Sequence, residues 1–316
     1  MNATRRFPPG PGWPLVLLAI AWAARALAAP DIAGFALENP APGVYVHYGA
    51  VAEMSRANAG DVANVGFVIG SRCVAVIDTG GTYAVGRALR DALRKVTALP
   101  VCYVVNTHAH PDHVFGNAAF VSDHPEFVGH ARLTDALQLR GPNYLNALHR
   151  DLGDVAEGTV VVLPTRTVFD TLDLDLGGRV LTLRAWPTAH TDCDVTVLDR
   201  ESGTLWLGDL LFVDHLPVLD GNLRGFLGAI EALRTQPAAR AIAGHGRAGD
   251  WPQALDAEER YLRGLQTDVR AAIRQGRSLS QTLAATTTSS DPGWRLVDAF
   301  HRRNVSAAYA ELEWNE

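Results

Sequence analysis

Cysteine is scarce in this sequence: the 316 residues include only Cys73, Cys102 and Cys193. An odd number leaves at least one cysteine without a disulfide partner in the same molecule. Cys73 and Cys102 lie in or beside apolar runs, and we expect both to be small core residues. Cys193 follows His190 by three residues, and we expect it also to be a buried packing residue.

The sequence also lacks an apolar run long enough to remain as a transmembrane helix. The apolar stretch at residues 15–24 is shorter than the roughly 20 residues that span a bilayer, and Arg25 interrupts it. It follows the basic pair Arg5 and Arg6 and precedes Ala-Leu-Ala at residues 26–28, which is the pattern of a cleavable signal peptide. We therefore expect a signal peptide over residues 1–29, a periplasmic mature protein and no integral membrane segment after cleavage. The pattern leaves the export route open.

Positive charge is in short supply. The chain has 28 Lys and Arg against 34 Asp and Glu, for a formal net charge of −6. Removal of residues 1–29 would delete three arginines and no acid, and would change the net charge to about −9. The sequence contains no dense basic run. Because binding to nucleic acid depends on Lys and Arg at the phosphates, the composition argues against a nucleic-acid partner.

What the sequence does contain is a series of short apolar runs and a hydrophobic content of 47%, enough for a substantial core. Apolar runs typical of strands occupy residues 44–47, 66–70, 101–105, 160–163, 167–170 and 179–186, of which we assign the last three to a second sheet. Apolar residues at helical spacing predict helices over about 83–96, 223–233 and 293–310. Residues 140–158 are expected to form a long loop or short helices. We expect residues 251–316 to be a helical extension packed on a domain of residues 30–250.

The run Thr-His-Ala-His-Pro-Asp-His at residues 107–113 is the most informative stretch of the chain. It follows a buried strand, and imidazole and carboxylate are ligands that suit zinc and similar divalent ions. His108 and His110 are two residues apart on extended backbone and can point the same way. Asp112 and His113 follow Pro111, where the chain turns, so they can face a second point nearby. One loop can therefore supply parts of two adjacent metal sites.

Three further candidate ligands each end a short apolar run: His190, Asp209 and His245. In layered α/β folds, the loops that carry ligands lie at such strand ends. Seven residues therefore form the predicted metal centre: His108, His110, Asp112, His113, His190, Asp209 and His245.

The order of these residues, with Asp78 before them in Val-Ala-Val-Ile-Asp-Thr-Gly (residues 74–80), resembles the five motifs of the metallo-β-lactamase superfamily. The resemblance covers about residues 43–250 and implies a four-layer αβ/βα sandwich with the metals at one edge of the sheets. It implies that His108, His110 and His190 hold one metal ion, and that Asp112, His113 and His245 hold the other. Asp209 would bridge the two ions.

Within that superfamily, the sequence is similar to the quinoprotein relay system zinc metallohydrolases, a SoxH-related branch. The similarity lies in four segments: residues 64–69 (Asn-Val-Gly-Phe-Val-Ile), 110–120, 208–221 and 303–314. It implies an exported zinc enzyme, with two Zn²⁺ per chain, that is associated with a periplasmic quinoprotein (PQQ-dependent) dehydrogenase.

The expected reaction is hydrolysis of a small-molecule ester, thioester, lactone or amide by a metal-bound hydroxide, with Asp112 orienting that hydroxide and accepting its proton. Asp78 is expected to position the ligand loop without binding metal. His215 and Tyr144 are candidate substrate contacts, with Asp220 and Asn143 beside them in the same two loops.

Three positions distinguish this sequence from particular members of the superfamily. Cys193 stands where the superfamily usually has glycine. Asp209 is present as in glyoxalase II-like members, and argues against antibiotic hydrolysis as the main activity. His110 replaces the glutamate of the diiron flavoproteins and argues against an oxygen-reducing diiron site.

Two other hypotheses stay open. The first is a mononuclear iron sulfur dioxygenase with the same ligand set, which metal analysis would separate because iron is coloured or redox-active and zinc is neither. The second is a non-catalytic, metal-stabilised accessory of a quinoprotein dehydrogenase, which would capture its partner even after mutation of the ligands.

Overall fold

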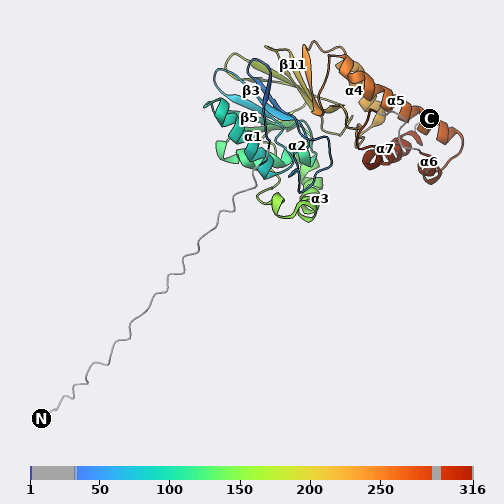
Figure 1. The fold of residues 1–316 in the computed structure, drawn as a ribbon, viewed down its shortest axis with the longest axis horizontal. Helices are drawn as coiled ribbons and strands as arrows, with labels where there is room; N and C mark the ends of the chain where they lie inside the picture. The colour runs from blue at the N-terminus through green and yellow to red at the C-terminus, as the bar shows by residue number, and fades with distance from the viewer. Residues whose placement is uncertain (2–31, 33, 287–292, 315–316) are drawn as a thin grey trace.

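Two β-sheets packed face to face form the centre of the molecule, and helices cover the outer face of each (Figure 1). The computed structural model describes residues 34–286 and 293–314, together with residues 1 and 32. The expected signal peptide, residues 1–29, lies outside the described residues apart from Met1. The four layers are those of the αβ/βα sandwich that the sequence predicts.

The first sheet, counted over the described residues, has seven strands in sequence order from β1 to β7. The pairs from β1 to β4 are antiparallel and the pairs from β4 to β7 are parallel. The strands are β1 (Glu38–Ala41), β2 (Val44–His47), β3 (Val65–Ile69), β4 (Val74–Ile77), β5 (Val101–Val105), β6 (Glu126–His130) and β7 (Arg166–Val168).

The second sheet, within the same described ranges, has five strands in the order β12–β11–β10–β9–β8. Only β11 and β12 are parallel in it. The strands are β8 (Thr171–Asp175), β9 (Val180–Ala185), β10 (Val195–Asp199), β11 (Thr204–Phe212) and β12 (Arg240–His245).

Successive residues of a strand point to opposite faces of the sheet, so alternate side chains pack either between the two sheets or against the outer helices. In β3, Val68 packs between the sheets against residues such as Trp206, whereas Val65 and Phe67 face the outer helical layer. The outer layer of the first sheet contains α1 (Tyr83–Val96), α2 (Pro111–Val114) and the 3₁₀ helix η1 (Phe115–Asp123). Thr82 begins α1 by accepting a hydrogen bond from Val85 N through its side chain.

Residues 140–158, predicted as a long loop or short helices, instead contain the second half of one long helix, α3 (Leu133–Leu152), which has 20 residues and runs through Pro142. Only the short 3₁₀ helix at residues 153–156 fits the prediction. Proline removes one helical hydrogen bond, but the buried residues of α3 pack into a hydrophobic cluster that keeps the helix intact. Gly141 lets Val161 approach closely, since a Cβ there would lie 2.9 Å from the Val161 side chain. Residues 160–163 therefore pack on α3 as an extended segment and form no strand, which corrects the prediction.

A second correction concerns the strand predicted at residues 167–170. The observed strand β7 ends at Val168 and pairs in parallel with β6, so it belongs to the first sheet. The chain crosses to the second sheet directly afterwards, at β8. Sequence pattern alone does not specify which sheet a short strand joins.

The helices that follow β11 pack on the outer face of the second sheet. They comprise α4 (Leu223–Leu233), α5 (Asp256–Arg274), α6 (Leu279–Ala285) and α7 (Val297–Leu312), with the 3₁₀ helices η2 (Gly153–Ala156) and η3 (Gln253–Leu255) elsewhere in the chain. Apolar residues of β11, α4, α5 and α7 form one continuous core cluster. None of the described helices has the length and apolar character needed to cross a bilayer.

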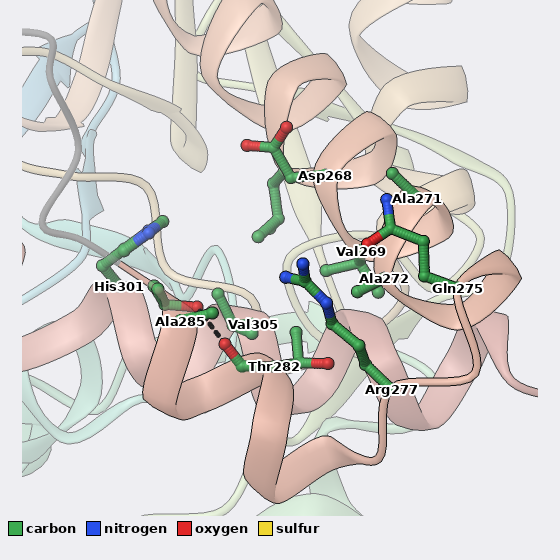
Figure 2. A pocket seen from close by; sticks show the side chains of 12 residues that line it. Asp268, Val269, Ala271, Ala272, Gln275, Arg277, Thr282, Ala285, His301 and Val305 are labelled. Atoms are coloured by element: carbon green, nitrogen blue, oxygen red, sulfur yellow. Dashed lines mark hydrogen bonds between the residues drawn. The ribbon is translucent and has the colours of Figure 1, made fainter.

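A cavity of about 300 Å³ lies among α5, α6 and α7 (Figure 2). Its polar lining comes from Asp268, Gln275, Arg277, Thr282, Thr286 and His301, and the guanidinium of Arg277 points toward its middle. None of the described residues that line it also lines the pocket beside the candidate metal ligands.

Cys73 and Cys102 form a disulfide, with their Cα atoms 5.7 Å apart. Cys73 directly precedes β4 and Cys102 lies on β5, and these two strands are neighbours in the sheet. Only a packing role was expected for these two cysteines, and their bond was not predicted. The spacing of two cysteines in the sequence does not show which strands are neighbours. In the chain-entropy model, closing a loop between residues 29 apart stabilises a fold by about 3.6 kcal/mol. Cys193 is free and buried, as expected.

Candidate metal centre

The predicted ligands come together where strands of the two sheets end. His108, His110, Asp112 and His113 follow β5, and His190 follows β9. The two remaining residues lie within the adjacent parallel strands β11 and β12. The ligand atoms fall into two groups, each within 4.8 Å: the first is His108, His110, His190 and Asp209, and the second is Asp112, His113 and His245.

In the first group, three imidazole nitrogens converge. His110 Nδ1 lies 3.1 Å from His108 Nε2 and 3.0 Å from His190 Nε2. Nitrogens that bind one tetrahedral zinc ion at 2.0–2.1 Å are about 3.3 Å apart. The spacing is therefore close to that of three ligands around one ion.

Asp209 lies between the two groups and turns one carboxylate oxygen toward each. Its Oδ2 is 3.6 Å from His108 Nε2 and 3.3 Å from His190 Nε2. Its Oδ1 is 3.1 Å from His113 Nε2 and 3.5 Å from His245 Nε2. Each group is therefore faced by one oxygen of the same carboxylate.

The second group is completed by Asp112. Its Oδ2 is 3.3 Å from His245 Nε2 and 3.6 Å from His113 Nε2. Asp112 is also partly exposed to the pocket described below. It therefore adjoins both the second group and the space open to a substrate.

Hydrogen bonds at Nδ1 orient four of the histidines. His190 donates to Val218 O at 2.8 Å and His245 donates to Val62 O at 3.0 Å, because a carbonyl oxygen can only accept. His113 donates to Asp78 at 2.8 Å. His108 lies 3.0 Å from Thr107 Oγ1, whose own proton is directed to Asp78. In each ring the Nε2 lone pair is thereby left facing the cluster.

Two buried polar atoms without hydrogen-bond partners indicate whether the site can hold metal ions. His113 Nε2 and Asp209 Oδ1 have no hydrogen-bond partner although both are fully enclosed. They face each other at 3.1 Å. Unpaired buried polar atoms are costly, and a divalent cation between them would satisfy both. The donor set and its geometry therefore fit a metal pair.

The two groups differ in their electrostatics. Burial lowers the pKa of His108 well below its ordinary value and lowers that of His190 to about 4. Burial also lowers the pKa of His113 and His245, but Asp209 and Asp112 outweigh it and raise the pKa of His245 to about 9 and that of His113 well above its usual range. The second group is thus an acidic environment that attracts positive charge.

Asp78 holds the ligand loop, residues 107–113, in place through hydrogen bonds. Its carboxylate accepts hydrogen bonds from Thr107 N at 2.8 Å, Thr107 Oγ1 at 2.7 Å and His113 Nδ1 at 2.8 Å. Asp78 has a φ of +51°, a left-handed conformation that aspartate adopts more readily than most residues. The structure thus places it as a positioning residue, outside both groups of ligand atoms.

Glycines make room for Asp209. A Cβ at Gly244, in the neighbouring strand, would collide with Asp209 Oδ1. A Cβ at Gly208 would lie 2.6 Å from the Thr107 side chain, and Gly208 also has a φ of +51°. The close approach of β11 to β12 and to the ligand loop therefore requires glycine at both positions.

A pocket of about 440 Å³ opens beside the cluster. His110, Asp112, Asp209 and His245 lie in its wall, and so do three residues suggested by the sequence: His215, Tyr144 and Asp220. Asp220 accepts a hydrogen bond from His110 Nε2 at 3.1 Å. Asn143 is exposed on α3 and is not part of the wall, so its predicted proximity to substrate was wrong.

Several residues around the site have no signal in the sequence pattern. Phe300 and Arg303 of α7 line the pocket, and the Phe300 ring packs on His215 with centroids 5.1 Å apart. Glu258 of α5 is fully buried and accepts a hydrogen bond from Phe212 N at 3.2 Å. Glu258 and Phe300 lie on helices more than 40 residues beyond the residues that they contact here, Phe212 and His215.

Asn304 of α7 holds the loop that carries Val218. Its Oδ1 accepts from Leu219 N at 3.0 Å, and its Nδ2 donates to Pro217 O at 2.6 Å and to Tyr261 OH at 2.9 Å. Val218 lies between these two anchored residues, and its carbonyl accepts the proton of His190 Nδ1. The C-terminal helices are therefore connected to the metal centre through a short chain of hydrogen bonds.

A family model, the metallo-beta-lactamase superfamily, matches residues 59–245 and so includes all seven candidate ligands. The chain belongs to this superfamily. Membership together with the His and Asp cluster indicates a metallohydrolase. The match ends before α5, so the C-terminal helices lie outside it.

Solved structures show the same fold. The chain is similar to TMB-1 (18% identity, TM-score 0.58, covering 74% of this chain and 98% of that one). It is also similar to a metallo-beta-lactamase from Pontibacter korlensis (20% identity, TM-score 0.56, covering 72% and 98%). A variant of the sec-alkyl sulfatase PisA1 aligns over 89% of this chain but only 50% of its own (15% identity, TM-score 0.66). No curated protein matches the sequence significantly.

Proposed function

We propose that the protein is an exported dinuclear zinc hydrolase that cleaves a small ester, thioester, lactone or amide. The observation that carries this proposal is the position of Asp209, with one carboxylate oxygen toward each of two histidine groups. His108, His110 and His190 would hold one ion, and Asp112, His113 and His245 the other. Asp209 would bridge them.

Bound metal ions would supply a Lewis acid for the substrate oxygen and lower the pKa of a water molecule to near neutrality. The role of the chain is to place groups around that reaction. Asp112 faces the pocket, and although burial raises its pKa, His113 and His245 hold it below its ordinary value. An ionised Asp112 can therefore accept a proton from a nucleophilic water and orient it toward a substrate in the pocket.

His215 and Tyr144 would contact the substrate with neutral groups. Burial lowers the pKa of His215 to about 4, and its Nδ1 donates to Leu216 O at 2.7 Å, so Nε2 is left as a hydrogen-bond acceptor. Burial raises the pKa of Tyr144, which keeps the phenol protonated as a hydrogen-bond donor. Together with Phe212 and Phe300 they form an amphipathic wall suited to a small organic substrate.

Export and the quinoprotein association are part of the proposal. Export is supported by the leader pattern at residues 1–29 and by the Cys73–Cys102 disulfide, since structural disulfides persist mainly in oxidising compartments. Association with a quinoprotein (PQQ-dependent) dehydrogenase is supported by the resemblance of residues 110–120, 208–221 and 303–314 to the quinoprotein relay system branch.

The test is a hydrolytic screen of purified protein of known metal content. Esters, thioesters, lactones and amides would be assayed with the zinc-loaded wild type, the chelated protein and the His190→Ala variant. The proposal predicts turnover of at least one class by the loaded wild type, and its loss in the other two samples. A fully loaded protein without turnover of any class would contradict it and would favour the accessory hypothesis.

A further inference from the structure

The substrate pocket has a wall that lies outside the region matched by the family model. α7 contributes Phe300 and Arg303 to it, beyond the end of the match at residue 245. Among the described residues that line this pocket, Arg303 is the only lysine or arginine. We propose that Arg303 binds a carboxylate on the substrate, so that the substrate is a small apolar molecule with one acidic end. This rests on the proposed hydrolase function and deepens it.

The charge of Arg303 is available to a ligand. In the part of the chain that the structure describes, no carboxylate forms an ion pair with it, and its side chain is exposed. Arg140, also near the pocket, is instead paired with Asp220 at 3.5 Å and Asp192 at 3.7 Å. Arg302 donates to Leu283 O at 2.8 Å, on the side of α6.

The backbone of Arg303 is fixed beside the pocket. The next residue, Asn304, is fully buried and binds both Pro217 and Leu219 of the pocket loop. Phe300 and Arg303 are three residues apart on α7 and so lie on one face of the helix. The guanidinium carbon of Arg303 lies 5.5 Å from the centre of the Phe300 ring. The loop and the aromatic ring therefore place this arginine at the pocket before any ligand arrives.

The residues that line the pocket differ in exposure and polarity. The candidate metal ligands in its wall are buried or partly buried, whereas Arg303 is exposed to solvent. Apolar groups also line it, among them Met54, Phe212 and Phe300. A substrate would place its cleaved bond at the metals, its apolar body along these side chains and its acidic group at Arg303. A planar guanidinium recognises a carboxylate through two parallel hydrogen bonds, which a lysine cannot reproduce.

Glu53, which also lines the pocket, carries a negative charge opposite in sign to that of Arg303, and its side chain is also exposed. Asp220 is already engaged by His110 and Arg140. Glu53 would repel an acidic substrate and would attract an amino group. The carboxylate assignment therefore predicts that Glu53→Gln improves binding of an acidic substrate, whereas Arg303→Met weakens it.

The kinetic test compares two esters that differ in one charge, mono(4-nitrophenyl) glutarate and its methyl ester. The zinc-loaded wild type should have the lower KM for the acid. Arg303→Met should raise the KM for the acid by about tenfold, with little change in kcat or in the KM of the methyl ester. Arg303→Lys should recover part of the loss. Arg302→Met, which removes the adjacent arginine outside the pocket, is the matched control and should leave both KM values unchanged.

The second test measures binding and does not depend on turnover. Calorimetry would compare 4-phenylbutyrate with 4-phenylbutyramide on the same zinc-loaded proteins. The carboxylate should bind the wild type and Arg302→Met alike and Arg303→Met about tenfold more weakly, with no such difference for the amide. Arginine-dependent binding without hydrolysis of any ester would support the carboxylate site and contradict the hydrolase. Equal binding of the carboxylate to the wild type and Arg303→Met would overturn the carboxylate site, whether or not the esters are cleaved.

Discussion

His190 donates its Nδ1 proton to the carbonyl oxygen of Val218 at 2.8 Å, which directs its Nε2 toward His110 and Asp209. Val218 is held in place by Asn304, which binds the residues on either side of it. The orientation of a candidate ligand after β9 thus depends on a helix more than 100 residues later in the chain. The C-terminal helices are therefore linked to a candidate metal ligand through hydrogen bonds.

Asn304→Ala should loosen this arrangement. It leaves Leu219 N and Pro217 O without their buried partner, at a cost of about 1–3 kcal/mol for each unpaired group. We expect the ion held by His190 to bind about tenfold more weakly, since groups that orient a ligand typically have such effects. Competition with a coloured chelator measures this. Ser306→Ala is the control, because Ser306 is partly exposed on α7 and its hydroxyl donates a hydrogen bond to Arg302 O of the same helix. Unchanged affinities for both ions in Asn304→Ala would contradict the prediction.

Asp209→Ala should weaken the metal pair more than the loss of any one histidine. The change removes the carboxylate oxygen that faces each group, and with it the negative charge that would lie between two bound cations. We expect the variant to retain about one zinc per chain, and elemental analysis after dialysis measures the ratio. Retention of two ions would show that Asp209 does not bridge them.

Asp112→Asn should reduce turnover by about 100-fold or more, the usual range for loss of a positioned proton acceptor. The substitution keeps the shape of the side chain but removes its charge, so the metal content must be measured beside the rate. KM should change less than kcat, because Tyr144, His215 and the apolar wall remain. A fully loaded Asp112→Asn protein with the wild-type rate would exclude Asp112 from the chemistry.

Glu258→Gln should stabilise the protein increasingly as pH rises. Burial raises the pKa of Glu258 well above its ordinary value of 4.5. Folded Glu258 therefore keeps a proton that the unfolded chain releases above about pH 4.5, and this costs folding free energy progressively from that pH upward. The melting temperature of Glu258→Gln relative to wild type should rise between pH 5 and pH 8, by on the order of 5 °C.

Glu259→Gln provides the matched control for that experiment. Glu259 adjoins Glu258 on α5, but it is paired with Arg234 at 2.6 Å, and despite some desolvation its arginine partners lower its pKa. Its replacement should give no stabilisation that grows with pH. A Glu258→Gln curve parallel to that of the wild type from pH 5 to pH 8 would show that Glu258 does not titrate as described.

The mature protein should begin near residue 29 or 30 and contain one disulfide. The leader pattern predicts cleavage after Ala28 or Ala29, and the structure pairs Cys73 with Cys102 and leaves Cys193 buried. N-terminal sequencing and non-reducing mass spectrometry of protein from the native host test both points. A product that starts at Met1 or Asn2 and carries three free thiols would contradict export.

The fold and the ligand cluster were largely predictable from the sequence. Apolar runs in the sequence show where strands end, as at Val105. Because these strands are adjacent, the candidate ligands at or near their ends meet at one edge of the sheets. The helix at Tyr83–Val96 was predicted at the observed bounds because its apolar spacing is regular, and the structure adds that Thr82 caps it.

What the sequence left undetermined depends on contacts between distant segments. The Gly141–Pro142 pair suggested a loop, but packing of α3 against the 156–163 segment overrides it. The disulfide required knowing that β4 and β5 are neighbours. The roles of Asn304 and Arg303 were not predictable from the sequence, because they depend on α7 folding back over the 213–222 loop.

The central claim is that one chain holds two metal ions at Asp209. Elemental analysis of the purified mature wild-type protein, loaded with excess zinc and then dialysed, tests it most directly. The two ligand groups and the orphaned atoms of His113 and Asp209 predict close to two zinc ions per chain. A ratio that stays at one or below with zinc in excess would contradict the dinuclear centre.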